Sequence, residues 1–234
     1  MSVRLDQVIP WGRSIDEYRR MFDLSPADLR GRILGCGDGP ASFNAEATAR
    51  GGGRVTSCDP IYSLRGDLIR RRFDECAGPL MAQVRATPEH YVWTVHRDPA
   101  DLLRNRRRAM DAFLADYDSG DRRGRYVAAA LPALPFVGGA FDLALVSHLL
   151  FLYSDLLDRA FHERSIRELC RVAREVRLFP LVSLDCAPSP HVEPVCAALE
   201  EGGFEVEIRR VAYEFVRGAD RMMIIVPGRG ELSS

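Results

Sequence analysis

Residues 33–39 read ILGCGDG, a short apolar run that ends in three closely spaced glycines. The apolar character of residues 31–34 predicts a strand, and the glycines predict a tight loop directly after it. Because glycine has no side chain, such a loop lets the backbone approach a ligand closely and offer its N–H groups. The stretch therefore predicts a strand and loop that hold a nucleotide-like ligand.

The residues after the loop predict a helix and a second strand. Pro40 suits the first turn of a helix that runs to residue 49, and three glycines at 51–53 end it. Residues 54–58 predict a strand that ends at Asp59. A strand, loop, helix and strand in this order form the first half of a parallel α/β sheet.

Asp59 follows Gly39 by 20 residues, at the end of the second predicted strand. An acid at this place can accept hydrogen bonds from both hydroxyls of a ribose. The glycine spacing is G-x-G-x-G, one residue shorter than the G-x-G-x-x-G of dinucleotide enzymes. S-adenosylmethionine (SAM) carries no phosphate and needs close approach rather than a diphosphate cradle. The spacing and the acid together favour SAM as the ligand.

The alternation of strands and helices resumes after residue 125. Ser14 and Glu17 predict a capping box for an N-terminal helix, and Ser154 predicts the N-cap of a long helix that reaches Val176. The pattern predicts an α/β fold: a Rossmann-like, mostly parallel seven-stranded sheet with an antiparallel edge hairpin and helices on both faces. The further predicted strands cover 126–130, 141–147, 178–185, 204–215 and 221–226, and the further helices cover 14–24, 154–176 and 192–201.

Residues 61–125 are arginine-rich and helical in pattern, with few strand signals. The clearest predicted helices cover 64–76 and 100–117. We interpret the segment as a helical insertion between the second and third strands, packed over the strand ends.

Composition excludes several classes of protein. The chain has 234 residues, of which 47% are hydrophobic and 28% charged, with a net charge of −1, as expected of a globular domain. All 32 basic residues are arginine. A Walker loop and a pyridoxal enzyme both require a lysine, so both are excluded.

The six cysteines include no C-x-x-C pair, which leaves zinc-ribbon and thioredoxin-type sites without support and favours buried free thiols. No apolar run reaches the ~20 residues of a membrane helix. The first ten residues lack the pattern of a signal peptide. We therefore expect a cytoplasmic protein without a membrane partner.

These motifs resemble those of the class I SAM-dependent methyltransferases, with the subfamily not identified. Residues 33–39 resemble the first motif of that superfamily, and Asp59 resembles its ribose-binding acid. Residues 134–136, LPF, followed by 139–145, GAFDLAL, resemble the run that leads into the superfamily's fourth strand. The motifs cover most of residues 31–185 and are specific to the superfamily, not to a substrate.

The pattern of predicted elements divides the chain into three expected parts. Residues 1–30 would form an N-terminal helical flap. In it Trp11, Arg13 and Tyr18 would cover the cofactor or pack as ordinary core residues. Residues 31–227 would form the SAM-binding methyltransferase domain, with the insertion at about 61–125 as a substrate lid. Residues 228–234 would form a flexible tail.

The resemblance also implies SAM as cofactor and S-adenosylhomocysteine as product. The superfamily usually has acids at the positions of Ile33 and Ala130, so this chain departs from the pattern twice. We expect the adenine to be held by backbone near Ala130 and by packing on Pro60, and the methionine portion to lie near Ser147. The expected cofactor-binding residues are Gly35, Cys36, Gly37, Gly39, Asp59, Pro60, Ile61, Ala130, Leu131 and Ser147.

Three residues are candidates for a catalytic role. His148 directly follows the fourth strand and His191 follows the fifth, and open α/β folds bind ligands at these strand ends. Either imidazole could act as a base near pH 7, or His148 could pack under the lid as a neutral, hydrogen-bonded group. Tyr153 could orient a substrate or be an aromatic core residue. No ligand spacing supports a metal site.

Three functions remain open on the sequence. The first is methyl transfer to a small-molecule acceptor through oxygen, nitrogen or sulfur. The second is a nucleic-acid or protein methyltransferase that docks through the arginine runs 70–72 and 104–108, although the segment is only slightly basic and no RNA-binding module is attached. The third is a SAM-binding module without transferase activity. A homodimer is possible in each case.

Overall fold

A seven-stranded sheet forms the centre of the computed structural model, which describes residues 10–51, 54–119 and 124–228. Within these residues the strands lie in the order β3-β2-β1-β4-β5-β7-β6. The first five are parallel, and β7 runs antiparallel to both of its neighbours. The predicted fold class is therefore confirmed. The strands are β1 Arg32–Cys36, β2 Arg54–Cys58, β3 Tyr126–Val127, β4 Phe141–Ser147, β5 Ala173–Phe179, β6 Phe204–Arg210 and β7 Arg221–Pro227.

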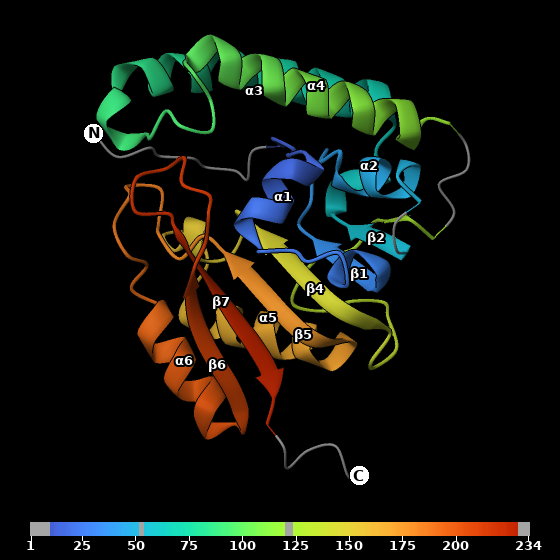
Figure 1. The fold of residues 1–234 in the computed structure, drawn as a ribbon, viewed down its shortest axis with the longest axis vertical. Helices are drawn as coiled ribbons and strands as arrows, with labels where there is room; N and C mark the ends of the chain where they lie inside the picture. The colour runs from blue at the N-terminus through green and yellow to red at the C-terminus, as the bar shows by residue number, and fades with distance from the viewer. Residues whose placement is uncertain (1–9, 52–53, 120–123, 229–234) are drawn as a thin grey trace.

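Helices cover both faces of the sheet and one of its ends (Figure 1). Helices α1 and α2 share one apolar core with the sheet, and α5 and α6 share a second core on the opposite face. Helices α3 and α4 lie side by side across the end towards which the arrows of β4 and β5 point. The helices are α1 Ile15–Met21, α2 Phe43–Ala49, α3 Gly66–Ala86, α4 Pro99–Tyr117, α5 Arg159–Val172 and α6 Val192–Glu201.

The apolar strands are buried on both faces, which is why their sequences are almost continuously hydrophobic. In β1, Ile33 belongs to the core beneath α1 and α2, whereas Leu34 belongs to the core beneath α5 and α6. In β4, Leu145 and Val146 divide in the same way. Successive side chains of a strand point to opposite faces, so a single sheet separates the two cores.

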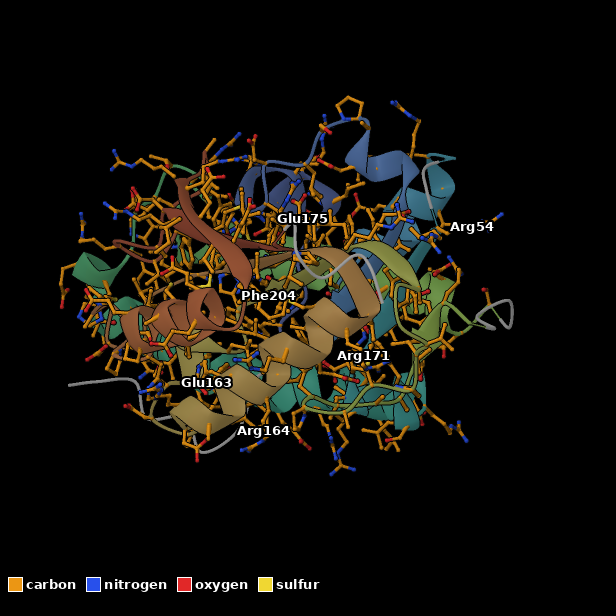
Figure 2. The ribbon with its side chains drawn as sticks, turned by 90° about the horizontal axis from the view of Figure 1, so that it is seen from below. Arg54, Glu163, Arg164, Arg171, Glu175 and Phe204 are labelled. Atoms are coloured by element: carbon orange, nitrogen blue, oxygen red, sulfur yellow. The ribbon has the colours of Figure 1, made fainter. Side chains whose placement is uncertain are left out.

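Helix α5 is amphipathic in the way that such packing requires. Its residues Ile166 and Leu169 are fully buried against the sheet. Arg164 and Arg171 are exposed, and Figure 2 shows this helix from the end of the molecule opposite α3 and α4. The helix begins after Asp158, whose carboxylate accepts a hydrogen bond of 2.7 Å from the N–H of Phe161.

The insertion has an apolar core of its own. Ile69, Phe73 and Ala77 of α3 are buried with aromatic residues of α4 and the preceding turn. The Tyr117 hydroxyl at the end of α4 donates to the backbone oxygens of Tyr62 and Leu64, at 2.8 Å each. The pair α3–α4 is thereby fixed to the end of β2.

Several predicted boundaries are wrong. Ser154 does not cap a helix; its hydroxyl donates to the oxygen of Phe151, and Asp158 is the N-cap of α5. Val176 lies in β5 rather than in that helix. Ala173 and the residues after it pair with β4, so an apolar run that suits a helix becomes a strand through tertiary contacts.

Other boundaries shift for local reasons. Helix α2 begins at Phe43 because Gly39, with φ at +53°, and Pro40 belong to the turn before it. Helix α3 continues past residue 76 to Ala86 despite Pro79, because Met81 and Val84 extend its buried face. The third strand is confined to residues 126–127.

Residues 1–9 of the predicted flap and 229–234 of the predicted tail lie outside the described residues. In the part of the chain that is described, no helix combines the length and the apolar character needed to cross a bilayer.

Candidate active site

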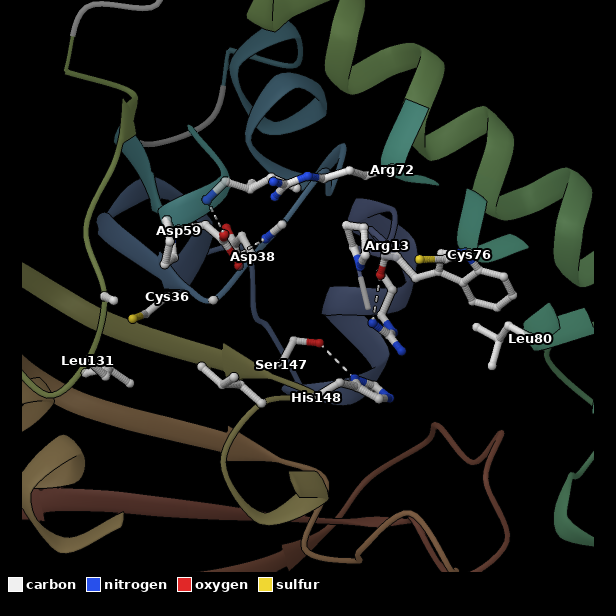
Figure 3. Close-up of a pocket in the computed structure, with 18 of the residues that line it drawn as sticks. Arg13, Cys36, Asp38, Asp59, Arg72, Cys76, Leu80, Leu131, Ser147 and His148 are labelled. Atoms are coloured by element: carbon white, nitrogen blue, oxygen red, sulfur yellow. Dashed lines mark hydrogen bonds between the residues drawn. The ribbon is translucent and has the colours of Figure 1, made fainter. Parts of the chain in front are cut away.

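A cavity of about 840 Å³ opens where the carboxyl ends of β1, β2 and β4 meet α3 (Figure 3). The glycine loop and Asp59 line one part of it, and residues 72–83 of α3 line another. Ligand sites of open α/β sheets occur at this place, and the volume suits a cofactor with a small acceptor. The predicted residues that line the cavity are Cys36, Gly37, Gly39, Asp59, Pro60, Ile61, Ala130, Leu131, Ser147 and His148.

The glycine loop has the backbone geometry that its sequence predicts. Gly37 and Gly39 have φ values of +70° and +53°, which L side chains rarely adopt. The N–H of Gly37 donates to the oxygen of Cys58 at 2.8 Å. The loop is thereby tied to the end of β2 and turns its backbone towards the cavity.

Asp59 stands at the end of β2 with both carboxylate oxygens in use. One accepts from the N–H of Gly39 at 2.9 Å, and the other from the N–H of Ile61 at 2.8 Å. Burial raises the pKa of this carboxyl, and the two N–H groups oppose that rise. Each oxygen keeps a further lone pair, so the carboxylate can still accept hydrogen bonds from a ribose.

Asp38 is a site residue that the sequence analysis missed. Its carboxylate is buried and accepts hydrogen bonds from the hydroxyls of Tyr18, at 2.6 Å, and Ser57, at 2.7 Å. Burial raises the pKa of Asp38 to about 6, although both hydroxyls act to lower it. The sequence did contain a signal for this residue. Ile33 stands where the superfamily usually has an acid, and Asp38 is an acid a few residues later, inside the glycine loop.

Gly35 does not line the cavity but makes room for Asp38. A β-carbon on Gly35 would stand 1.9 Å from a carboxylate oxygen of Asp38. The first glycine of the loop is therefore required by the packing of this carboxylate beneath it, and it stays a prediction as a cofactor contact.

The part of the cavity expected to hold an adenine is built mainly from backbone and apolar groups. Ala130 is exposed to it, whereas Leu131 is buried. Ile61 also lines the cavity, and so does Phe161 of α5, which the sequence did not predict. The thiol of Cys58 donates to the oxygen of Ala129 at 3.4 Å and so joins this loop to β2.

Ser147 and His148 lie together at the end of β4 (Figure 3). The Ser147 hydroxyl is 2.9 Å from Nδ1 of His148, and the backbone N–H of His148 donates to the oxygen of Phe179 at 2.6 Å. Burial, followed by the charges of Arg13 and Arg106, holds the pKa of His148 well below its usual value. The imidazole is therefore neutral at pH 7, and Nε2 is the nitrogen left for a ligand when Nδ1 carries the proton.

The structure separates the other two catalytic candidates from this site. Neither Tyr153 nor His191 lines the cavity. Tyr153 is buried in the turn after β4, and His191 lies beside His162, with its Nε2 at 3.2 Å from the oxygen of Ser154. Both residues follow strand ends in sequence, but their side chains pack elsewhere.

The roof of the cavity comes from segments that carry no sequence motif. Trp11 and Arg13 line it from the chain before α1, as the flap interpretation allowed. Gly12 between them packs so closely that a β-carbon would stand 1.9 Å from the oxygen of Pro40. The cavity-lining residues of α3 are Arg72, Glu75, Cys76, Pro79, Leu80 and Gln83.

The described residues around this site form no disulfide and no cluster of metal-binding side chains. All six cysteines are free; Cys36 and Cys58 are buried and the other four are partly exposed. Across residues 10–51, 54–119 and 124–228, no three His, Cys, Asp or Glu side chains gather as a candidate metal site.

The strand order, the glycine loop at the end of β1 and Asp59 at the end of β2 define a class I SAM-dependent methyltransferase fold. The sequence matches no known family model. It is 30% identical over 224 residues to MJ0045 of Methanocaldococcus jannaschii, an uncharacterized protein, and the match covers 95% of this chain and 98% of that protein. The chain belongs to the same family as this archaeal protein.

Two solved structures of similar architecture are named as methyltransferases. Magnesium protoporphyrin IX methyltransferase of Synechocystis, solved with bound SAM, is 12% identical, with a TM-score of 0.44 over 84% of this chain and 69% of that chain. A TehB-like SAM-dependent methyltransferase of Corynebacterium glutamicum is 13% identical, with a TM-score of 0.43 over 86% of this chain and 82% of that chain. At this level of similarity they assign no substrate to this chain.

Proposed function

We propose that this chain binds SAM in the cavity and transfers its methyl group to a small-molecule acceptor held beneath α3. The observation that carries the proposal is that one continuous cavity of about 840 Å³ joins the glycine loop and Asp59 to the residues of α3. A cofactor at one end and an acceptor at the other could then approach each other in line. Positioning of this kind supplies much of the acceleration of a bimolecular reaction.

Residues in different parts of the cavity would have different roles. Asp59 would hold the ribose, while the backbone of Gly37 and Gly39 would allow close approach of the cofactor. SAM, when bound, supplies an activated methyl group on a sulfonium. Because His148 is neutral and lines the cavity, it could accept a proton from a hydroxyl acceptor.

The arginine runs of the insertion favour this function over docking of a nucleic acid. Arg70 of α3 pairs with Asp111 of α4, and Arg104 pairs with Asp101 at 3.0 Å. Arg71 pairs with Glu75 at 2.8 Å. The charges of these three arginines are balanced within the chain, which supports solvated helix faces at their positions rather than a phosphate-binding surface.

The proposal is tested by following methyl-labelled SAM in a cell extract that contains the purified protein. We expect label to enter the low-molecular-mass fraction in a time-dependent way, and not without the protein. Label in protein or nucleic acid would contradict the small-molecule acceptor and favour the second function. Tight binding of S-adenosylhomocysteine without any label transfer would instead favour a SAM-binding module.

A further inference from the structure

Arg13 is a cation of the cavity wall without an anionic partner. Its guanidinium points into the cavity beside His148 (Figure 3), and Nη1 donates to the backbone oxygen of Trp11 at 3.1 Å. Its Nε is buried and has no hydrogen-bond partner. In the part of the chain that the structure describes, no carboxylate lies within 4.0 Å of this guanidinium. A guanidinium carries five N–H donors, so most of those of Arg13 remain available.

The buried acid whose charge acts on Arg13 is already occupied. Glu17 accepts hydrogen bonds from Arg106 at 2.8 Å and from the Tyr213 hydroxyl at 3.0 Å. Arg106 therefore pairs with this carboxylate, Arg13 does not, and the neighbouring His148 is neutral. Burial and then the charge of Arg106 lower the pKa of Arg13, but an arginine keeps its proton at any ordinary pH. Among Arg13, Arg106 and Glu17, the charge of Arg13 is the one left without an opposite charge beside it.

An unpaired charge that is partly buried in a cavity wall is costly unless a ligand balances it. We propose that Arg13 is the anchor of a carboxylate-binding subsite, filled by a carboxylate of a molecule bound in the cavity. This inference rests on the proposed function, because the two sources of the carboxylate are the methionyl group of SAM and the acceptor itself. One guanidinium balances one negative charge, and its planar fork matches the two oxygens of a carboxylate.

The first arm of the test compares ligands that differ only near the carboxylate. Calorimetry measures S-adenosylhomocysteine, its decarboxylated analogue and 5′-methylthioadenosine, which lacks the amino-acid portion. If the cofactor is the source, Arg13→Gln weakens the binding of S-adenosylhomocysteine by about 10- to 100-fold, as expected for the loss of a charge-assisted hydrogen bond. The same substitution leaves the binding of methylthioadenosine unchanged. Arg13→Lys should recover part of the loss. Arg19→Gln removes the same charge from an exposed position of α1 and should change nothing.

The second arm tests the acceptor as source. Benzoate is added to protein saturated with S-adenosylhomocysteine, and benzamide serves as the uncharged control. The midpoint of thermal unfolding is recorded in each case. If the acceptor is the source, benzoate raises the midpoint of the wild type but not of Arg13→Gln, and benzamide raises neither.

The possible failures are distinguishable. Equal binding of S-adenosylhomocysteine by the wild type and Arg13→Gln, with no carboxylate effect that depends on Arg13, overturns the subsite and leaves the proposed function intact. Absence of binding of every nucleoside by the wild type overturns the proposed function and the subsite with it. Should Arg13→Gln fail to fold, measurements on the wild type alone decide. The subsite then requires that the decarboxylated analogue binds at least about 10-fold more weakly than S-adenosylhomocysteine, or that benzoate raises the thermal midpoint of unfolding and benzamide does not.

Discussion

Arg106 of α4 donates a hydrogen bond of 2.8 Å to the carboxylate of Glu17 of α1, and both side chains are almost completely buried. The same carboxylate accepts from the hydroxyl of Tyr213, which precedes β7. The charge of Arg106 and its hydrogen bond, together with His96, hold the pKa of Glu17 well below its usual value against the opposing effect of burial. This buried pair fastens the insertion to the helix that covers the sheet.

Breaking this pair should destabilise the protein strongly. Arg106→Met leaves the Glu17 carboxylate buried without its cation, and we expect the free energy of unfolding to fall by about 3–5 kcal/mol. The matched control is Arg70→Met, which breaks the exposed pair with Asp111 between α3 and α4 and should cost no more than about 1 kcal/mol. Denaturant unfolding measures both, and equal losses would contradict the role given to Glu17.

Glycine substitutions test the packing beneath the loop. Gly35→Ala places a methyl group against the Asp38 carboxylate, which Tyr18 and Ser57 hold in place, so we expect a loss of about 1–3 kcal/mol. Gly78→Ala in α3 meets nothing within 4 Å and should stabilise the protein by about 0.5–1 kcal/mol. Unfolding curves measure both changes in the free energy of unfolding. Changes of the same sign for the two variants would argue against the close contact at Gly35.

Asp38 should make stability depend on pH in a defined window. Its pKa rises from 3.8 to about 6 in the folded protein, so the folded state holds the proton more tightly than the unfolded state. Its stabilising contribution is complete below pH ~4 and is lost as the pH rises through about 6. Between these values the wild type should lose about 3 kcal/mol relative to Asp38→Asn. Urea unfolding at a series of pH values tests this, and a constant difference would refute it.

His148 should remain neutral well below its usual pKa of 6.5. Burial is the main cause, and the charge of Arg13 is the next, so Arg13→Gln should raise the pKa of His148. Ring nitrogen shifts measured by NMR between pH 8 and 6 report the protonation state, with His148→Gln for assignment. A midpoint at or above 6.5 in the wild type would show that the imidazole is not held as described.

The parts of the fold that could be predicted are those set by local sequence. The apolar strands, the glycine loop and the position of Asp59 follow from residues near one another in the chain, and the structure has them where expected. The capping box of Ser14 and Glu17 is also present. The boundary between α5 and β5 was predicted wrongly, because pairing of Ala173 with Phe141 decides it.

Much of the site depends on contacts that no local pattern encodes. Asp38 is turned inwards by Tyr18, 20 residues before it, and by Ser57, 19 residues after it. The roof depends on where α3 crosses the sheet, which the helical period of residues 64–76 does not specify. His191 follows a strand end and yet faces His162, since position in sequence does not fix side-chain direction.

The central claim is that the cavity at Asp59 binds SAM, and calorimetry with S-adenosylhomocysteine tests it most directly. We predict that the wild type binds, that Asp59→Asn weakens binding by about 10- to 100-fold through loss of the ribose contacts, and that Asp67→Asn at an exposed position of α3 has no effect. Absence of binding to the folded wild type, or binding that Asp59→Asn leaves unchanged, would contradict the account.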